Sequence, residues 1–261
     1  MMTQLQDCIW CSSPVRKASI EHILPEALGC PPGFCLTDCV CMACNNRLGH
    51  VDQALLRQFE IIAFLGGVRR KGGRPPSIDN WAPIKARYAE NGPELHMNAG
   101  PQTVDAFGAR LPAASPRNGI QFVSLEPRIP GVRTELKFEQ EFGRGPKFSR
   151  ALHKVAFGAL AYFVGAEEAR SHRFDPVRDF VRNGRGQFNV MMTCAQQLGG
   201  HRFNPPVYLP ERTLPIVEFE IFGVAFLLDL DVEQKGLMQV RDALIAHSAS
   251  NWTILPRTVS K

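Results

Sequence analysis

Apolar side chains recur about every third or fourth position in four parts of the chain, and this period predicts helices. The expected helices span residues 50–65, about 146–169, 175–183 and 234–246. The third is also marked at its ends, because Asp175 can cap it, Pro176 suits the first helical position and Asn183-Gly184 stops it.

Other parts of the chain show alternating or β-branched runs bounded by Gly, Pro and Asn, which predict strands. These runs fall between about 82 and 142, at 187–195 and at 216–230, and a short apolar run follows at 252–255. We expect an α+β fold in three parts: an N-terminal module at 1–66, a basic Gly- and Pro-rich linker loop at 67–81, and a larger mixed α+β domain with an antiparallel sheet at 82–261.

Composition adds little to this picture. With 261 residues, of which 44% are apolar and 21% charged, the chain can bury a substantial core. Its amino terminus lacks the basic start and apolar core of a signal peptide, and its most apolar runs are too short or too charged to cross a bilayer. We therefore expect a cytoplasmic protein that is not bound to a membrane.

The cysteines carry the clearest chemistry. Seven of the eight lie between residues 8 and 44, and four of them form two C-x2-C pairs, Cys8 with Cys11 and Cys41 with Cys44. Paired spacing of this kind is typical of structural zinc sites. Cys30, Cys35 and Cys39 complete no second site, and they are read either as ordinary thiols or as part of a rearranged zinc site that uses Cys39.

Between and after these pairs lie Glu21-His22, Pro25, Gly29, Asn45 and Gly49. In this order and spacing, with the cysteines, they resemble the HNH endonuclease family, in its branch where a four-cysteine zinc site staples the ββα-metal fold. The resemblance covers about residues 8–57. It implies a phosphodiester hydrolase whose products carry 5′ phosphate and 3′ hydroxyl ends.

The resemblance also implies a role for each matched residue. His22 would be the general base, since histidine side chains titrate near neutral pH. Glu21 and Asn45 would offer oxygen ligands to a catalytic Mg²⁺ or Mn²⁺ ion, while Zn²⁺ holds the fold. Neighbouring residues of a regular strand point to opposite faces. Because Glu21 and His22 must both approach one phosphate, they should lie at a strand end or a bulge.

One position departs from the family pattern. Many HNH sequences carry a middle Asn nine residues before the last motif residue, and Leu36 stands there instead. Asp38 or Thr37 could brace the loop in its place. A zinc-stapled module that has kept its fold and lost catalysis, binding nucleic acid or protein, is therefore an alternative, as is an HNH nuclease that acts on RNA.

The partner implied by the resemblance is nucleic acid, with double-stranded DNA as the first expectation. The chain has a net charge of +5, yet residues 1–60 hold four basic and six acidic side chains, so most phosphate contacts should come from later segments. The candidate contacts are Arg47, Arg69, Arg70, Lys71, Arg74, Lys147, Arg150 and Lys154. Each of these could equally belong to an ordinary solvated surface. The region after residue 82 would position substrate, recognise it or form a homodimer.

Overall fold

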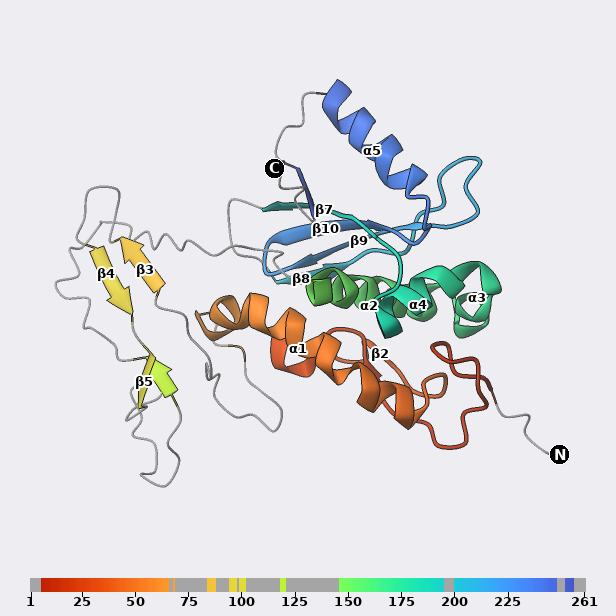
Figure 1. Ribbon diagram of the computed structural model, residues 1–261, viewed down its shortest axis with the longest axis horizontal. Helices are drawn as coiled ribbons and strands as arrows, with labels where there is room; N and C mark the ends of the chain where they lie inside the picture. The colour runs from red at the N-terminus through yellow and green to blue at the C-terminus, as the bar shows by residue number, and fades with distance from the viewer. Residues whose placement is uncertain are drawn as a thin grey trace. The chain divides into compact units, whose positions relative to one another are not determined.

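The computed structural model describes residues 6–65, 68, 84–87, 94–97, 99–101, 118–120, 146–194, 200–247 and 252–255. The chain forms two compact units. One unit combines residues 1–59 with 143–261, and the other comprises residues 60–142. The fold is mixed α+β with antiparallel sheets, as the sequence predicted (Figure 1).

The first unit opens with a small hairpin followed by a long helix. The elements are β1 (Glu21–His22), the 3-10 turn η1 (Glu26–Leu28), β2 (Cys35–Leu36) and α1 (Met42–Leu65). α1 begins eight residues before the predicted start at residue 50, because its buried stripe already includes Cys44 and Leu48 ahead of Val51 and Leu55. The helix therefore starts directly after the second cysteine pair.

Three helices and one 3-10 turn follow in the second half of this unit. They are α2 (Pro146–Phe163), α3 (Ala166–Arg170), η3 (His172–Phe174) and α4 (Asp175–Asn183). The single helix predicted to run to about residue 169 is broken at Gly165, whose φ of 119° is not helical. α4 has its predicted bounds and ends at Gly184 in the left-handed conformation, although Asp175 is its first residue and not its cap.

The sheet of this unit has five strands in the order β11-β7-β10-β9-β8, each antiparallel to its neighbours. The strands are β7 (Val190–Cys194), β8 (His201–Phe203), β9 (Ile216–Ile221), β10 (Val224–Asp229) and β11 (Thr253–Leu255). Phe222 and Gly223 have φ values of 52° and 82°, so they join β9 to β10 as a tight two-residue turn of the type that suits the twist of a hairpin. α5 (Lys235–Ala246) precedes β11.

α2 lies between the five-stranded sheet and α1 and is almost wholly buried (Figure 1). Its Phe157 packs on Trp10 with ring centroids 4.9 Å apart, and both rings are buried. Burying an aromatic side chain contributes about 1.5–3 kcal/mol, so this pair is a substantial tie between the cysteine-rich segment and α2. His201 on β8 adds a second tie, its Nε2 lying 2.6 Å from the Leu28 carbonyl oxygen.

After the end of α1, the described residues of the second unit form two strand pairs. β3 (Ile84–Arg87) pairs with β4 (Glu94–Met97), and β5 (Ala99–Pro101) pairs with β6 (Asn118–Ile120), both antiparallel. Within the described ranges of the whole chain, no helix is long and apolar enough to cross a membrane. The expected boundaries at residues 66 and 82 stay a prediction, and the compact units found here join residues 143–261 to the cysteine-rich segment.

Candidate active site

The sulfur atoms of Cys8, Cys11, Cys41 and Cys44 all lie within 4.8 Å of one another. The Cys11 and Cys41 sulfurs are 3.9 Å apart. Four thiolates at about 2.3 Å around a tetrahedral Zn²⁺ ion have sulfur atoms about 3.8 Å apart, so the cluster fits a structural zinc site. Cys30, Cys35 and Cys39 lie outside it and are free thiols.

Hydrogen bonds join the four sulfurs of this cluster to nearby backbone amides and to one another. The amides of Cys41 and Cys44 donate to the sulfurs of Cys8 and Cys41, each at 3.4 Å. Hydrogen bonding from Cys44 lowers the pKa of Cys8, sharing that proton raises the pKa of Cys44, and burial raises the pKa of Cys41. Zinc binding would release the thiol protons, because the metal binds thiolates.

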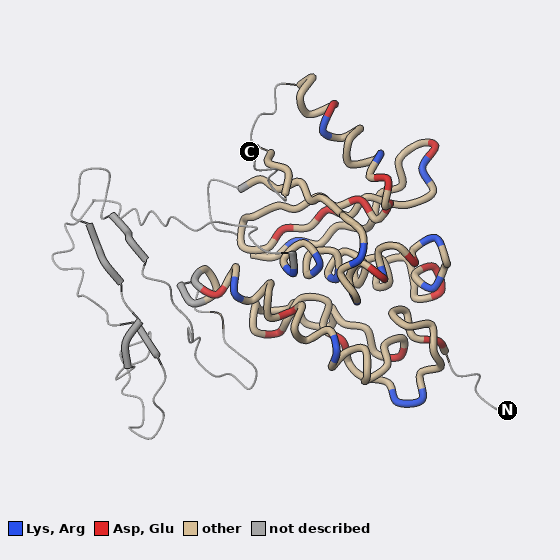
Figure 2. Tube along the Cα trace, in the orientation of Figure 1, with Lys and Arg blue, Asp and Glu red and all other residues tan. Residues whose placement is uncertain are grey.

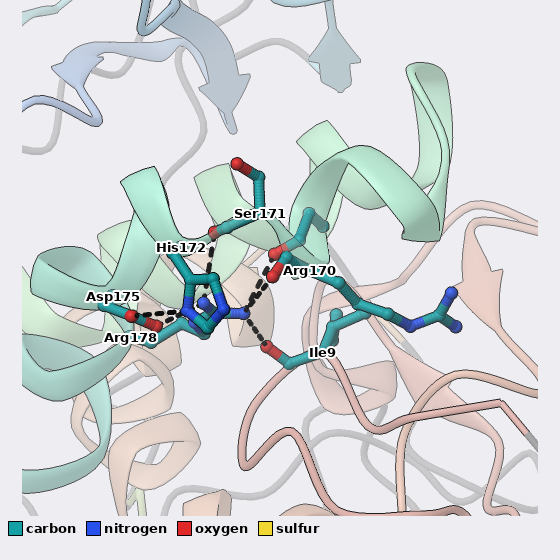
Figure 3. A network of polar contacts seen from close by, with 7 residues as sticks. Ile9, Arg170, Ser171, His172, Asp175 and Arg178 are labelled. Carbon is teal, nitrogen blue, oxygen red and sulfur yellow. Dashed lines mark hydrogen bonds and ion pairs between the residues drawn. The ribbon is translucent and has the colours of Figure 1, made fainter.

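Arg178 fixes the loop that holds the first cysteine pair (Figure 3). Its buried guanidinium donates to the Ile9 carbonyl at 3.4 Å, to the carbonyls of Ala169, Arg170 and Ser171 at 3.1–3.3 Å, and to the Asp175 carboxylate. Ile9 lies between Cys8 and Trp10. The Arg178 guanidinium therefore links the loop that holds Cys8 and Cys11 to the junction of α3 with α4.

Glu21 and His22 form the two-residue strand β1, which pairs with β2 in the register Glu21 to Leu36 and His22 to Cys35. β1 has only these two residues, so both stand at a strand end as predicted, yet their side chains differ in environment as those of strand neighbours do. The Glu21 carboxylate is buried, whereas the His22 side chain is 35% exposed. Leu36, at the position where many HNH sequences carry Asn, is a buried apolar residue opposite Glu21.

Glu21 is bound by a lysine from α2. Lys154 Nζ contacts Glu21 Oε1 and donates to both carboxylate oxygens of Asp52 on α1, at 2.8 and 2.9 Å. Burial alone would lower the pKa of Lys154, but Asp52 and Glu21 raise it overall, so the ammonium is charged. Burial raises the pKa of the Glu21 carboxyl, and Lys154 opposes that rise.

The donor atoms near β1 have the chemistry that a hard cation requires. Asn45 Nδ2 donates to the carbonyl of Ile20, the residue before Glu21, at 3.1 Å, which places Asn45 beside β1 and leaves its Oδ1 as a ligand atom. A cation here would need the Glu21 oxygen that Lys154 does not hold, on a side chain that is 5% exposed. Two carboxylates and one ammonium also leave a net charge of −1. Oxygen donors and residual negative charge fit Mg²⁺ or Mn²⁺.

His22 also has a neighbour that the sequence interpretation overlooked. Glu26, one turn further on, brings its Oε1 within 3.4 Å of His22 Nε2. The spacing of four residues gives no helical reason for this pair, because His22 ends β1 and the 3-10 turn begins only at Glu26. The contact between Lys154 and Asp52 could not be predicted from the sequence, because 102 residues separate them.

The predicted nucleic-acid contacts separate into three groups. Arg47 and Lys147 are exposed, and Arg47 donates to Asn183 Oδ1 at 3.0 Å. Arg150 and Lys154 were expected on an exposed helix face, and that expectation is wrong: both are buried, and the Arg150 guanidinium donates to the Val181 and Arg182 carbonyls. Arg69, Arg70, Lys71 and Arg74 lie outside the described residues.

Comparison with known proteins identifies the segment that contains these residues. Residues 8–60, about a fifth of the chain, match the model of the HNH endonuclease family. The match begins at the first cysteine of the zinc cluster and ends within α1, so it includes β1, β2 and Asn45. Neither the curated proteins nor the solved structures compared with the chain gave a match.

Proposed function

We propose that this chain is a metal-dependent endonuclease of the HNH type that hydrolyses phosphodiester bonds of DNA. The observation that carries the proposal is the coincidence of the family match at 8–60 with the geometry of that segment. There, a cysteine cluster that fits zinc frames a hairpin with a half-exposed histidine, and a buried carboxylate lies next to it in the chain.

His22 is the proposed general base. Its side chain is open enough for a water molecule to reach the imidazole, which takes a proton from that water as the water attacks phosphorus. The Glu26 carboxylate, 3.4 Å from Nε2, stabilises the positive charge that the imidazole acquires. The bond from phosphorus to the 3′ oxygen breaks, and that oxygen takes a proton from solvent water to form the 3′ hydroxyl.

Glu21 and Asn45 are the proposed ligands of a Mg²⁺ or Mn²⁺ ion. When bound, such an ion supplies positive charge to the phosphate and the departing oxygen. Lys154 and Asp52 keep the Glu21 side chain in one place, and the Ile20 carbonyl does the same for Asn45. The cysteine cluster takes no part in the chemistry and holds the hairpin against the start of α1.

A zinc-stapled module without catalysis is the second candidate. It is favoured by buried Leu36 at the position of the middle Asn and by the ion pair that already engages Glu21. An RNA nuclease would keep the same residues and change only the substrate.

In all these cases a reducing, cytoplasmic setting would keep the four thiols available to zinc. The C-terminal residues 143–261 would position the substrate or form a homodimer.

Sequencing the ends of cleaved nucleic acid separates these candidates. Supercoiled plasmid and structured RNA are each incubated with the zinc-loaded chain, with and without Mg²⁺ or Mn²⁺. The proposal expects metal-dependent cuts in DNA with 5′ phosphate and 3′ hydroxyl ends. Cuts in RNA alone would support the RNA nuclease, and the absence of cuts in both would support the silent module.

A further inference from the structure

The C-terminal end of α4 brings together exposed cations from three helices. Asn183, the last residue of α4, accepts a hydrogen bond from Arg47 on α1. Arg150 on α2 donates to the Val181 and Arg182 carbonyls of the same helix end. The end of α4 therefore touches both the helix that carries Asn45 and the start of α2.

We infer that Arg47, Lys147, Arg182 and Arg185, here named the α4-end surface, bind the phosphate backbone of double-stranded DNA. The inference rests on the proposed function, because that function makes DNA the substrate. Figure 2 shows the Lys and Arg positions of α1, α2 and α4 in blue.

The side chains of the α4-end surface are available to a ligand. Arg47 and Lys147 are exposed, and the Arg185 side chain is 79% exposed. Arg182 is half-buried, and its Nε is buried without a hydrogen-bond partner among the described residues, so it contributes charge to the surface and not an exposed Nε donor. Lys147 is three residues before Arg150 on α2, so it lies on the side of α2 that faces the end of α4.

Positive charge exceeds negative charge on this surface. Asp179 lies 3.9 Å from Arg185 Nη1 and accepts from Asn183, which offsets part of one cation. Beneath the surface, burial lowers the pKa of Arg150, and the charge of Arg47 adds to that shift, so these two guanidinium groups lie close together. Cations this near to one another are better stabilised by an external anion than by water alone.

The α4-end surface shares α1 with the proposed metal ligand Asn45. Arg47 follows Asn45 by two residues, about 200° around the helix, so the two side chains leave α1 on opposite sides, Asn45 toward Ile20 and Arg47 toward Asn183. Double-stranded DNA carries about one negative charge per 1.7 Å of its axis, which suits cations spread over several helices. The acidic balance of residues 1–60 favours phosphate contacts from later segments, and α2 and α4 supply part of that positive charge.

The test compares two charge-reversed proteins in a background that does not cut. His22→Ala protein, without added divalent cations, binds a fluorescent DNA duplex over a range of salt concentrations. The first variant adds Lys147→Glu and Arg185→Glu. The second adds Lys235→Glu and Arg241→Glu on α5, which changes the net charge equally at a different place.

The inference expects the first variant to bind more weakly, with a slope of log Kd against log salt lower by about 2, because each lost phosphate contact removes about 0.9. The second variant should keep the parent slope. An unchanged slope in the first variant, or equal losses in both, would overturn the inference. A loss seen with an RNA duplex and not with DNA would overturn the choice of DNA. Because binding is measured without cleavage, these outcomes are independent of whether His22 is catalytic.

Discussion

Lys154, on α2, forms a buried ion pair with Glu21, the residue directly before His22 in the chain. Their side chains are 2% and 5% exposed, and the same ammonium binds Asp52 on α1. The segment that matches the HNH family thus has its acidic residue held by a residue about 90 positions beyond its end. The nuclease-like module is completed by the C-terminal part of the chain.

Replacing this lysine should destabilise the protein strongly. Lys154→Met leaves two carboxylates without their cation, and breaking a buried pair in this way costs about 3–5 kcal/mol of unfolding free energy. Urea unfolding measures the loss. Lys235→Met, at an exposed position of α5, is the matched control and should change stability little. Equal stability of the two variants would contradict the buried pair.

The four cysteines should bind zinc as a unit. Metal analysis of the purified chain should find about one Zn²⁺ per chain, and Cys44→Ala should lose both the metal and thermal stability, because structural zinc contributes directly to folding. Cys35→Ser is the matched control, since Cys35 lies outside the cluster. Retention of zinc by Cys44→Ala, or its loss from Cys35→Ser, would refute the assignment.

His153 should make the protein less stable in acid. Burial lowers its pKa from 6.5 to about 4, so below pH 6.5 the unfolded chain binds a proton that the folded chain does not. Stability from this group is present at neutral pH and decreases by about 2 kcal/mol between pH 6.5 and 5. His153→Phe should show a shallower decrease in unfolding free energy than the parent. A parallel decrease would argue against the burial of His153.

Two helical glycines should respond differently to alanine. A Cβ at Gly49 of α1 meets nothing within 4 Å, so Gly49→Ala should stabilise the protein by about 0.5–1 kcal/mol. A Cβ at Gly158 of α2 would lie 3.1 Å from Ile23 Cγ2, in the segment just after His22, so Gly158→Ala should lose that gain through overpacking. Chemical unfolding of both variants tests the packing of α2 against Ile23. Equal gains in unfolding free energy would contradict that packing.

The sequence predicted the local features well and the long-range ones poorly. The paired spacing of the cysteines and the period of α4 depend on neighbours in the chain, so both could be read directly. The partner of Glu21 could not, because Lys154 looked like part of an exposed basic stripe and only the packing of α2 against α1 shows that it is buried. The prediction that Arg150 lies on an exposed helix face was wrong for the same reason, because its guanidinium is bound to backbone carbonyls of α4.

The catalytic role of His22 is the central claim, and plasmid nicking tests it most directly. Zinc-loaded parent, His22→Ala and His247→Ala are compared with Mg²⁺ or Mn²⁺, with matched zinc content and unfolding midpoints. His247 is an exposed residue after α5 and serves as control. We expect His22→Ala to nick about 10²–10⁴ times more slowly than the parent and His247→Ala to nick at the parent rate. Equal nicking by His22→Ala and the parent would show that His22 is not the general base.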